Sequence, residues 1–98
     1  MIPIRWSRRA AANLDSIYDY IAESNATAAI KQRNLILKAI EQLRDFPRSG
    51  RKGRVSPLDE LFVPKTSYVI YYRRTAEALD IAMIRHGAQR PLKRLPKA

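Results

Sequence analysis

The sequence predicts an α+β domain in which an N-terminal strand and an antiparallel helical hairpin pack on a small, largely antiparallel sheet. Two apolar stripes with helical spacing follow one another in the first half of the chain, and Phe46-Pro47 ends the second. Short runs rich in β-branched and aromatic residues, typical of strands, follow in the second half. Together these elements favour a helical hairpin that covers one face of the sheet.

The chain opens with a predicted strand and a capped helix. Apolar residues at even spacing over Ile2–Trp6 indicate a strand with one buried face, and Trp6 is expected to anchor the core. Ser7 stands where an N-cap belongs, because its hydroxyl can accept an unpaired backbone N–H. One helical face then carries Ala10, Ala11, Leu14, Ile17, Tyr18 and Ile21.

Acidic residues lie opposite that apolar face. Asp15, Asp19 and Glu23 recur at i, i+4 and i+8, which we interpret as a solvated face rather than as paired catalytic carboxylates. Asn25 can cap a second helix from about Ala26 to Asp45. The break of two residues between the helices predicts an antiparallel hairpin.

The second half reads as a basic loop, three strands and a tail. A loop is expected from Arg48 to Pro57, followed by a short strand over Leu61–Val63. Tyr68–Arg73 has β-branched and aromatic residues on both faces, as in a central strand, and at least two of its three tyrosines are expected in the core. A last strand covers Leu79 to about His86, and the basic tail from about Gly87 to Ala98 is expected to be loosely ordered.

Composition narrows the class of protein. Ninety-eight residues make one domain, and a formal net charge of +10 attracts polyanions such as nucleic acid, the ribosome surface or an acidic protein segment. The lack of cysteine and the single histidine argue against a disulfide framework or a zinc site, and we expect neither metal nor cofactor. No apolar run approaches the length of a membrane span, so a cytoplasmic protein without a membrane partner is expected.

Catalytic candidates gather in the last two strands. His86 is the one side chain whose ordinary pKa lies near neutrality, and Arg73 and Tyr72 could hold a phosphate or a base during RNA cleavage. The alternative is that His86 makes a structural hydrogen bond at the strand end, and this alternative carries about twice the weight. The period of two places Tyr72 and Arg74 on one sheet face and Tyr71 and Arg73 on the other.

Basic side chains also suggest a rim that binds a polyanion or a target protein. Four positive charges fall within the predicted loop, beside two glycines. A solvated loop and a binding rim are equally good interpretations of this run. The candidate residues are Arg48, Arg51, Lys52, Arg54, Lys65, Arg85 and Arg90.

Six short segments, taken in order, resemble the toxins of the ParE/RelE superfamily. The resemblance runs from Ile4 to about Arg90 and implies a small toxin neutralised by a cognate antitoxin, whose acidic segment folds on contact. It rests on Trp6-Ser7, Asp15–Ile21, Phe46–Arg51, Glu60–Pro64, Tyr68–Arg73 and Arg85–Arg90.

The resemblance leaves the target open among three alternatives. ParE-like members poison DNA gyrase, whereas RelE-like members cut messenger RNA on the ribosome. The E-L-F-V-P strand and the H-G-A-Q-R ending look closer to ParE. Asp59 stands where relatives often carry arginine and would repel a scissile phosphate. A gyrase inhibitor is therefore preferred, with an endoribonuclease as the alternative and a non-toxic, antitoxin-binding member as a third possibility.

Overall fold

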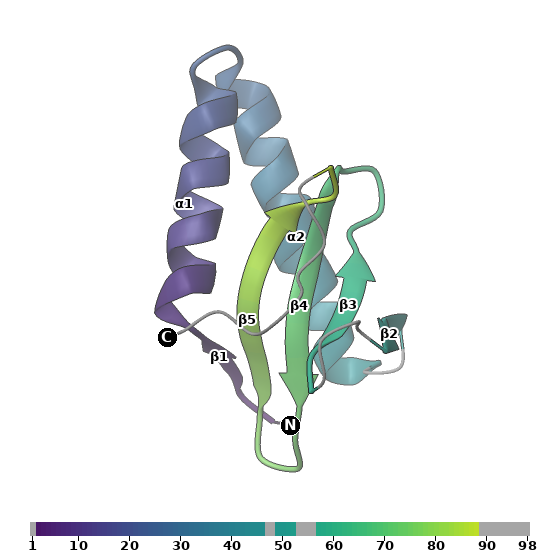
Figure 1. Ribbon diagram of the computed structural model, residues 1–98. Coiled ribbons are helices and arrows are strands. Elements are labelled where there is room, and N and C mark those ends of the chain that lie inside the picture. The colour runs from purple at the N-terminus through teal and green to yellow at the C-terminus, as the bar shows by residue number, and fades with distance from the viewer. Residues whose placement is uncertain (1, 47–48, 53–56, 89–98) are drawn as a thin grey trace.

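The computed structural model describes residues 2–46, 49–52 and 57–88. In chain order the elements are β1 (Ile4–Trp6), α1 (Arg8–Ala22), α2 (Ala26–Asp45), β2 (Arg51–Lys52), β3 (Asp59–Phe62), β4 (Tyr68–Arg74) and β5 (Leu79–His86). Figure 1 shows the two helices as a hairpin on one face of the sheet, its tip rising beyond the end of β5. The predicted α+β class and the hairpin are confirmed.

The sheet has the strand order β1-β5-β4-β3-β2. β1 pairs in parallel with β5, and the three other pairs are antiparallel, so the expected largely antiparallel sheet is confirmed. The register between β4 and β5 shifts between Tyr71 and Tyr72, where Ala82 is left over as a bulge.

Several strand boundaries differ from the expectation. β1 begins at Ile4 rather than Ile2, β3 covers Asp59–Phe62 instead of Leu61–Val63, and β4 ends at Arg74 instead of Arg73. The predicted loop from Arg48 to Pro57 contains the short strand β2, because Arg51 and Lys52 pair with Glu60 and Asp59 of β3. Of the predicted tail, Gly87 and Ala88 form a turn, and the expectation for residues 89–98 lies outside the described part of the chain.

Both helices begin at the predicted caps. The Ser7 hydroxyl accepts the backbone N–H of Ala10 at 2.9 Å, and the side-chain Oδ1 of Asn25 accepts that of Ala28 at 3.0 Å. Between the helices the Arg33 guanidinium lies 5.0 Å from the centre of the Tyr18 ring, a cation–π contact. The acidic stripe Asp15, Asp19 and Glu23 is exposed, as the solvated interpretation predicted.

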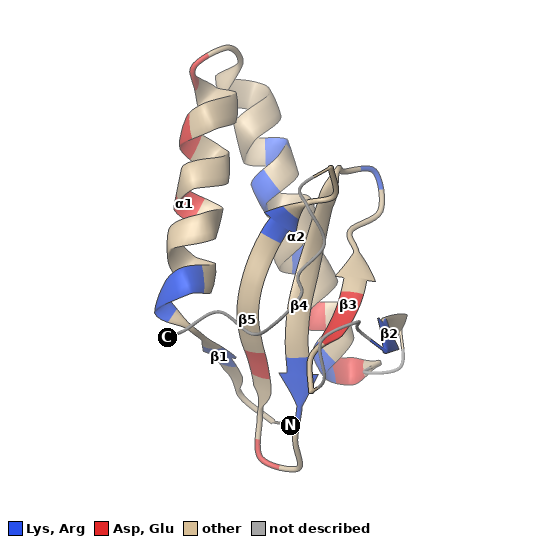
Figure 2. Ribbon diagram, in the orientation of Figure 1, with Lys and Arg blue, Asp and Glu red and all other residues tan. Residues whose placement is uncertain are grey.

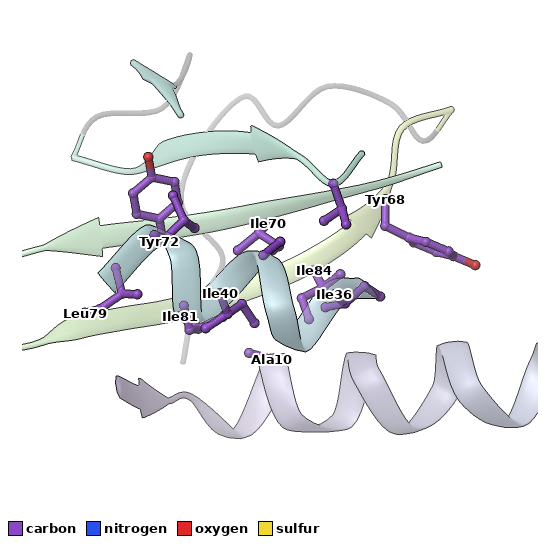
Figure 3. Packing of buried hydrophobic residues seen from close by; sticks show 12 residues of the cluster. Ala10, Ile36, Ile40, Tyr68, Ile70, Tyr72, Leu79, Ile81 and Ile84 are labelled. Atoms are coloured by element: carbon purple, nitrogen blue, oxygen red, sulfur yellow. The ribbon is translucent and has the colours of Figure 1, made fainter. Parts of the chain in front are cut away.

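The core lies between the helices and β4 with β5 (Figure 3). Tyr68, Ile70 and Tyr72 point from β4 into it, which places Val69, Tyr71 and Arg73 on the opposite sheet face. The prediction that at least two of the three tyrosines are buried is confirmed, with Tyr68 at 9% and Tyr72 at 1% exposure. Trp6 is partly buried and packs against this cluster, in agreement with its expected role as an anchor.

Candidate functional site

A cleft of about 730 Å³ opens between α1 and the C-terminal half of β5. It exists because β1 covers β5 only as far as Ile81, after which α1 runs beside the strand. Two side chains of the α1 segment attach the helix to the strand: the Ser7 hydroxyl donates to the Ala82 carbonyl at 2.7 Å, and the Asn13 carbonyl oxygen accepts the Ile84 N–H at 3.0 Å.

Beyond Asn13 the walls of the cleft come from both elements. α1 contributes Arg9, Asn13, Ser16, Ile17 and Tyr20, which are spaced as one stripe of a helix. The sheet contributes Tyr68, Met83, Ile84, Arg85 and His86.

Tyr68 and His86 face each other across the register of β4 and β5. Their rings meet edge to face, with centroids 5.5 Å apart and an interplanar angle of 84°. Burial raises the pKa of Tyr68, and the neighbouring Tyr20 raises it further. Nδ1 of His86 accepts the Ala88 N–H at 3.0 Å, so that Nε2 carries the proton of the neutral ring.

The opposite end of the sheet carries cross-strand pairs of opposite charge. Arg5 donates two hydrogen bonds to the Asp80 carboxylate, Nε to Oδ1 at 2.6 Å and Nη2 to Oδ2 at 3.0 Å. These bonds and the charges of Arg5 and Arg73 lower the pKa of Asp80, against a smaller opposing effect of burial. Arg73 stands opposite Asp80 in the register, so these three residues alternate in charge across β1, β5 and β4.

The two cations of strand β2 also stand opposite acidic residues. Arg51 stands opposite Glu60, with Nη2 3.6 Å from Oε1, and Lys52 stands opposite Asp59. Glu60 is 6% exposed, so Arg51 lies against a buried carboxylate. The cations of this part of the predicted rim therefore lie beside acids that weaken their field.

Tyr72 is held beneath Gly50. Burial raises the pKa of Tyr72 and the charge of Asp59 raises it further, whereas a hydrogen bond with the Gly50 backbone lowers it. A Cβ on Gly50 would overlap the Tyr72 hydroxyl and lie 2.7 Å from the Glu60 carbonyl oxygen. Position 50 therefore requires glycine for space, and this explains physically the glycine of the F-P-R-S-G-R segment.

The three candidates for RNA cleavage do not converge on one point. His86 pairs with Tyr68, four residues along β4 from Tyr72, or roughly 13 Å at 3.3 Å per residue. Tyr72 points into the core, and Arg73 points to the other face of the sheet, beside Asp80. A phosphodiester could not touch all three groups in this arrangement.

The candidates for polyanion binding separate in the same way. Arg51 and Lys52 lie on β2, whereas Arg85 lies at the other end of β5, and Lys65 sits in the turn before β4 with a left-handed φ of 66°. Arg48, Arg54 and Arg90 lie outside the described residues. Among the candidates in the described residues, Arg51 and Lys52 therefore lie apart from Arg85 along the sheet.

Sequence reasoning missed the α1 wall of the cleft. Its polar residues Arg9, Asn13, Ser16 and Tyr20 were not singled out as candidates for a site. The available signal was the i, i+4, i+7, i+8, i+11 spacing of Arg9, Asn13, Ser16, Ile17 and Tyr20, which defines a second stripe on the helix.

In residues 2–46, 49–52 and 57–88, no three His, Asp or Glu side chains are grouped to hold a metal ion. None of the helices in those residues has the length and apolarity needed to cross a membrane.

Comparisons with known proteins agree with this fold. Residues 4–91 match the family model for the ParE toxin of the type II toxin–antitoxin system parDE. A putative toxin, Y4kP of Sinorhizobium fredii, is 35% identical over 86 residues and 88% of each chain. Toxin RelE2 of Caulobacter vibrioides is 32% identical over 89 residues, covering 91% of this chain and 99% of its own.

A solved structure has the same architecture. It belongs to the chromosomal ParDE toxin–antitoxin system of P. aeruginosa and superposes with a TM-score of 0.78 at 26% identity, covering 88% of this chain and 96% of that one. With the family match over most of its length, this chain belongs to the ParE family of toxins of type II toxin–antitoxin systems.

Proposed function

We propose that the chain inhibits DNA gyrase and is neutralised by a cognate antitoxin whose acidic segment becomes ordered on binding. The match of residues 4–91 to the ParE toxin model is the observation that carries this proposal. Its natural setting is the cytoplasm, where the chromosome and its topoisomerases are found. The nineteen lysine and arginine residues suit this role, because an inhibitor requires a binding surface rather than a set of proton-transfer groups.

The positions of the nuclease candidates support inhibition over RNA cleavage. Tyr72 is 1% exposed and lies against Gly50, so it could neither donate to a phosphate nor stack on a base without unfolding its surroundings. Arg73 stands beside Asp80, which weakens its attraction for a phosphate. The remaining candidate, His86, accepts the backbone N–H of Ala88 on its Nδ1 atom.

The test is a supercoiling reaction with the purified, antitoxin-free chain. Relaxed plasmid, gyrase and ATP are combined with increasing amounts of the folded protein, and supercoiled and cleaved DNA are separated on a gel. Loss of supercoiling with accumulation of cleaved DNA at near-stoichiometric amounts is expected. No effect from protein with the circular dichroism of the folded state would contradict the proposal.

An RelE-like endoribonuclease remains the second candidate, because one relative bears the name toxin RelE2. His86→Ala separates the two functions. This substitution removes the one side chain of the chain whose ordinary pKa lies near neutrality. The rate of ribosome-dependent RNA cleavage should therefore fall by about 100-fold or more, which is the usual contribution of a general acid or base. Gyrase inhibition should stay within twofold of the parent (~0.4 kcal/mol). A variant that loses gyrase inhibition while remaining folded would place His86 in the target interface instead.

A further inference from the structure

Phe62 presents an exposed aromatic ring at the end of β3, on the sheet face that the helices do not cover. The ring is 54% exposed, whereas the tyrosines of β4 are buried or half-buried. In the register Phe62 stands opposite Val69, and Val69 stands opposite Arg85. Residues directly opposite each other share a sheet face, so Phe62 and Arg85 lie on either side of Val69, about 10 Å apart at about 4.8 Å between strands.

The turn between β3 and β4 has a defined shape that places a lysine next to this ring. The Thr66 hydroxyl donates to the Val63 carbonyl at 2.9 Å and accepts the first backbone N–H of β4 at 3.1 Å. Lys65 is exposed within this turn, with a left-handed φ of 66°. The Gly87 N–H donates to the Ser67 carbonyl at 2.7 Å, so the end of β5 is joined to the same turn.

The contact of Phe62 with Gly87 brings two of the family segments together. A Cβ on Gly87 would lie 3.0 Å from Cε1 of Phe62, so the ring of the E-L-F-V-P segment lies against the glycine of the R-H-G-A-Q-R segment. Phe62 is not a member of the core cluster or of the residues packed against it. Core packing therefore does not account for an aromatic ring at this position.

The surroundings of the ring carry cations without acids. Residues 61–72 and 81–88 include Lys65 and Arg85 but neither aspartate nor glutamate. Glu60, the acid that precedes them on β3, is 6% exposed and has Nη2 of Arg51 3.6 Å from its Oε1. In Figure 2 the blue segments of the β3–β4 turn and of the end of β5 lie at this end of the sheet, whereas the red segments of β3 and β5 lie toward the other end.

The other strongly exposed aromatic rings of the described residues have acidic neighbours. Tyr20 directly follows Asp19 on α1 and lies one turn before Glu23, and Phe46 directly follows Asp45 at the end of α2. A carboxylate beside a ring repels a phosphate that would accompany a stacked base. The surroundings of Phe62 lack this repulsion.

We infer that Phe62, Lys65 and Arg85 form a binding site for a single DNA strand, in which a base stacks on the Phe62 ring and phosphates lie at the two cations. An aromatic ring beside basic side chains is the arrangement by which proteins bind unpaired strands without sequence preference. These contacts are common to DNA and RNA. The choice of DNA rests on the proposed function, because gyrase holds DNA when the toxin acts on it.

The test is the fluorescence anisotropy of a short labelled oligodeoxythymidine titrated with the full chain, in the absence of gyrase. Phe62→Leu should weaken binding about tenfold (~1.4 kcal/mol), because leucine keeps an apolar contact with Gly87 but removes the stacking ring. Phe62→Tyr keeps the ring and should bind within twofold of the parent. Phe46→Leu, the matched change at another exposed ring, should have no effect. Duplex DNA should be insensitive to Phe62→Leu, because its bases are already stacked.

The salt dependence of the affinity tests the two cations. Each phosphate contact with a single strand contributes about −0.7 to the slope of log affinity against log salt. Lys65→Gln and Arg85→Gln should each reduce the slope by about that amount. Lys38→Gln, at an exposed position on α2, should leave it unchanged.

Four results would overturn the inference: no binding by the folded chain, equal effects of Phe62→Leu and Phe46→Leu, equal weakening of duplex and single strand by Phe62→Leu, or oligouridine bound tenfold more tightly than oligodeoxythymidine. The supercoiling assay gives an independent answer. A chain that binds the strand through Phe62 but leaves supercoiling intact refutes the proposed target alone. A chain that inhibits gyrase without binding the strand refutes the DNA site alone, and loss of that inhibition in Phe62→Leu would then identify Phe62 as a contact with protein.

Discussion

Gly50→Ala should destabilise the fold by steric overlap around Tyr72. A Cβ at position 50 would overlap the Tyr72 hydroxyl and lie 2.9 Å from Cε1 of the same ring. The ring is 1% exposed and the third neighbour is the Glu60 backbone, so neither neighbour can move freely.

The magnitude follows from three contributions. Overpacking costs about 2 kcal/mol, within the usual range of about 1–3 kcal/mol. Displacement of the Tyr72 hydroxyl from the Gly50 backbone costs about 1 kcal/mol more, the usual net value of a hydrogen bond. Alanine restricts the unfolded chain and returns about 0.5–1 kcal/mol. The net loss in the free energy of unfolding is therefore about 2 kcal/mol.

Urea denaturation followed by circular dichroism measures this loss, and Tyr72→Phe provides the control. Removing the hydroxyl relieves part of the overlap, so the two substitutions should be less harmful together than their sum, with a coupling of about 1 kcal/mol. Gly87→Ala should cost less than Gly50→Ala, because a Cβ there lies 3.0 Å from Cε1 of Phe62, which is 54% exposed and can turn away. Additive effects, or a loss below about 0.5 kcal/mol for Gly50→Ala, would refute the reasoning.

Two further predictions concern groups that connect distant parts of the chain. The pKa of Asp80 is lowered in the folded state, so its charge contributes stability above the ordinary carboxyl pKa, and that contribution disappears as the pH falls through the folded-state value. The difference in urea midpoint between the parent and Asp80→Asn should be greatest at neutral pH and vanish in strong acid; a gap that does not change with pH would contradict this. Asn13→Ala removes the acceptor of the Ile84 N–H and should cost about 1 kcal/mol in urea denaturation. Asn13→Asp, which keeps an acceptor, should cost less, and equal losses would show that the hydrogen bond is not the cause.

Local signals explain why the helices were predictable. Ser7 and Asn25 accept amide protons three residues ahead, and Phe46-Pro47 ends α2, so each boundary depends on neighbours in the sequence. The burial of Tyr68 and Tyr72 followed from the position of β4 inside the sheet, which its residue types indicated.

Long-range register explains what the sequence could not reveal. β2 has two residues, too few for a period of two to be recognised, and it forms by pairing with β3. The separation of His86 from Tyr72 depends on which residues of β4 and β5 face each other, including the shift at Tyr71 and Tyr72. The cleft depends on Asn13 meeting Ile84, 71 residues away, for which the sequence carries no local signal.

The pairing of β1 with β5 joins the beginning of the chain to its last strand. Ile4, Arg5 and Trp6 pair with Leu79, Asp80 and Ile81, so β1 cannot enter the sheet until β5 has been synthesised. The helical hairpin and the β3–β4–β5 meander involve near neighbours and can form earlier, because short loops close at lower entropic cost. β1 can join the sheet only once β5 is available, so a nascent or truncated chain that ends before Leu79 cannot complete this fold.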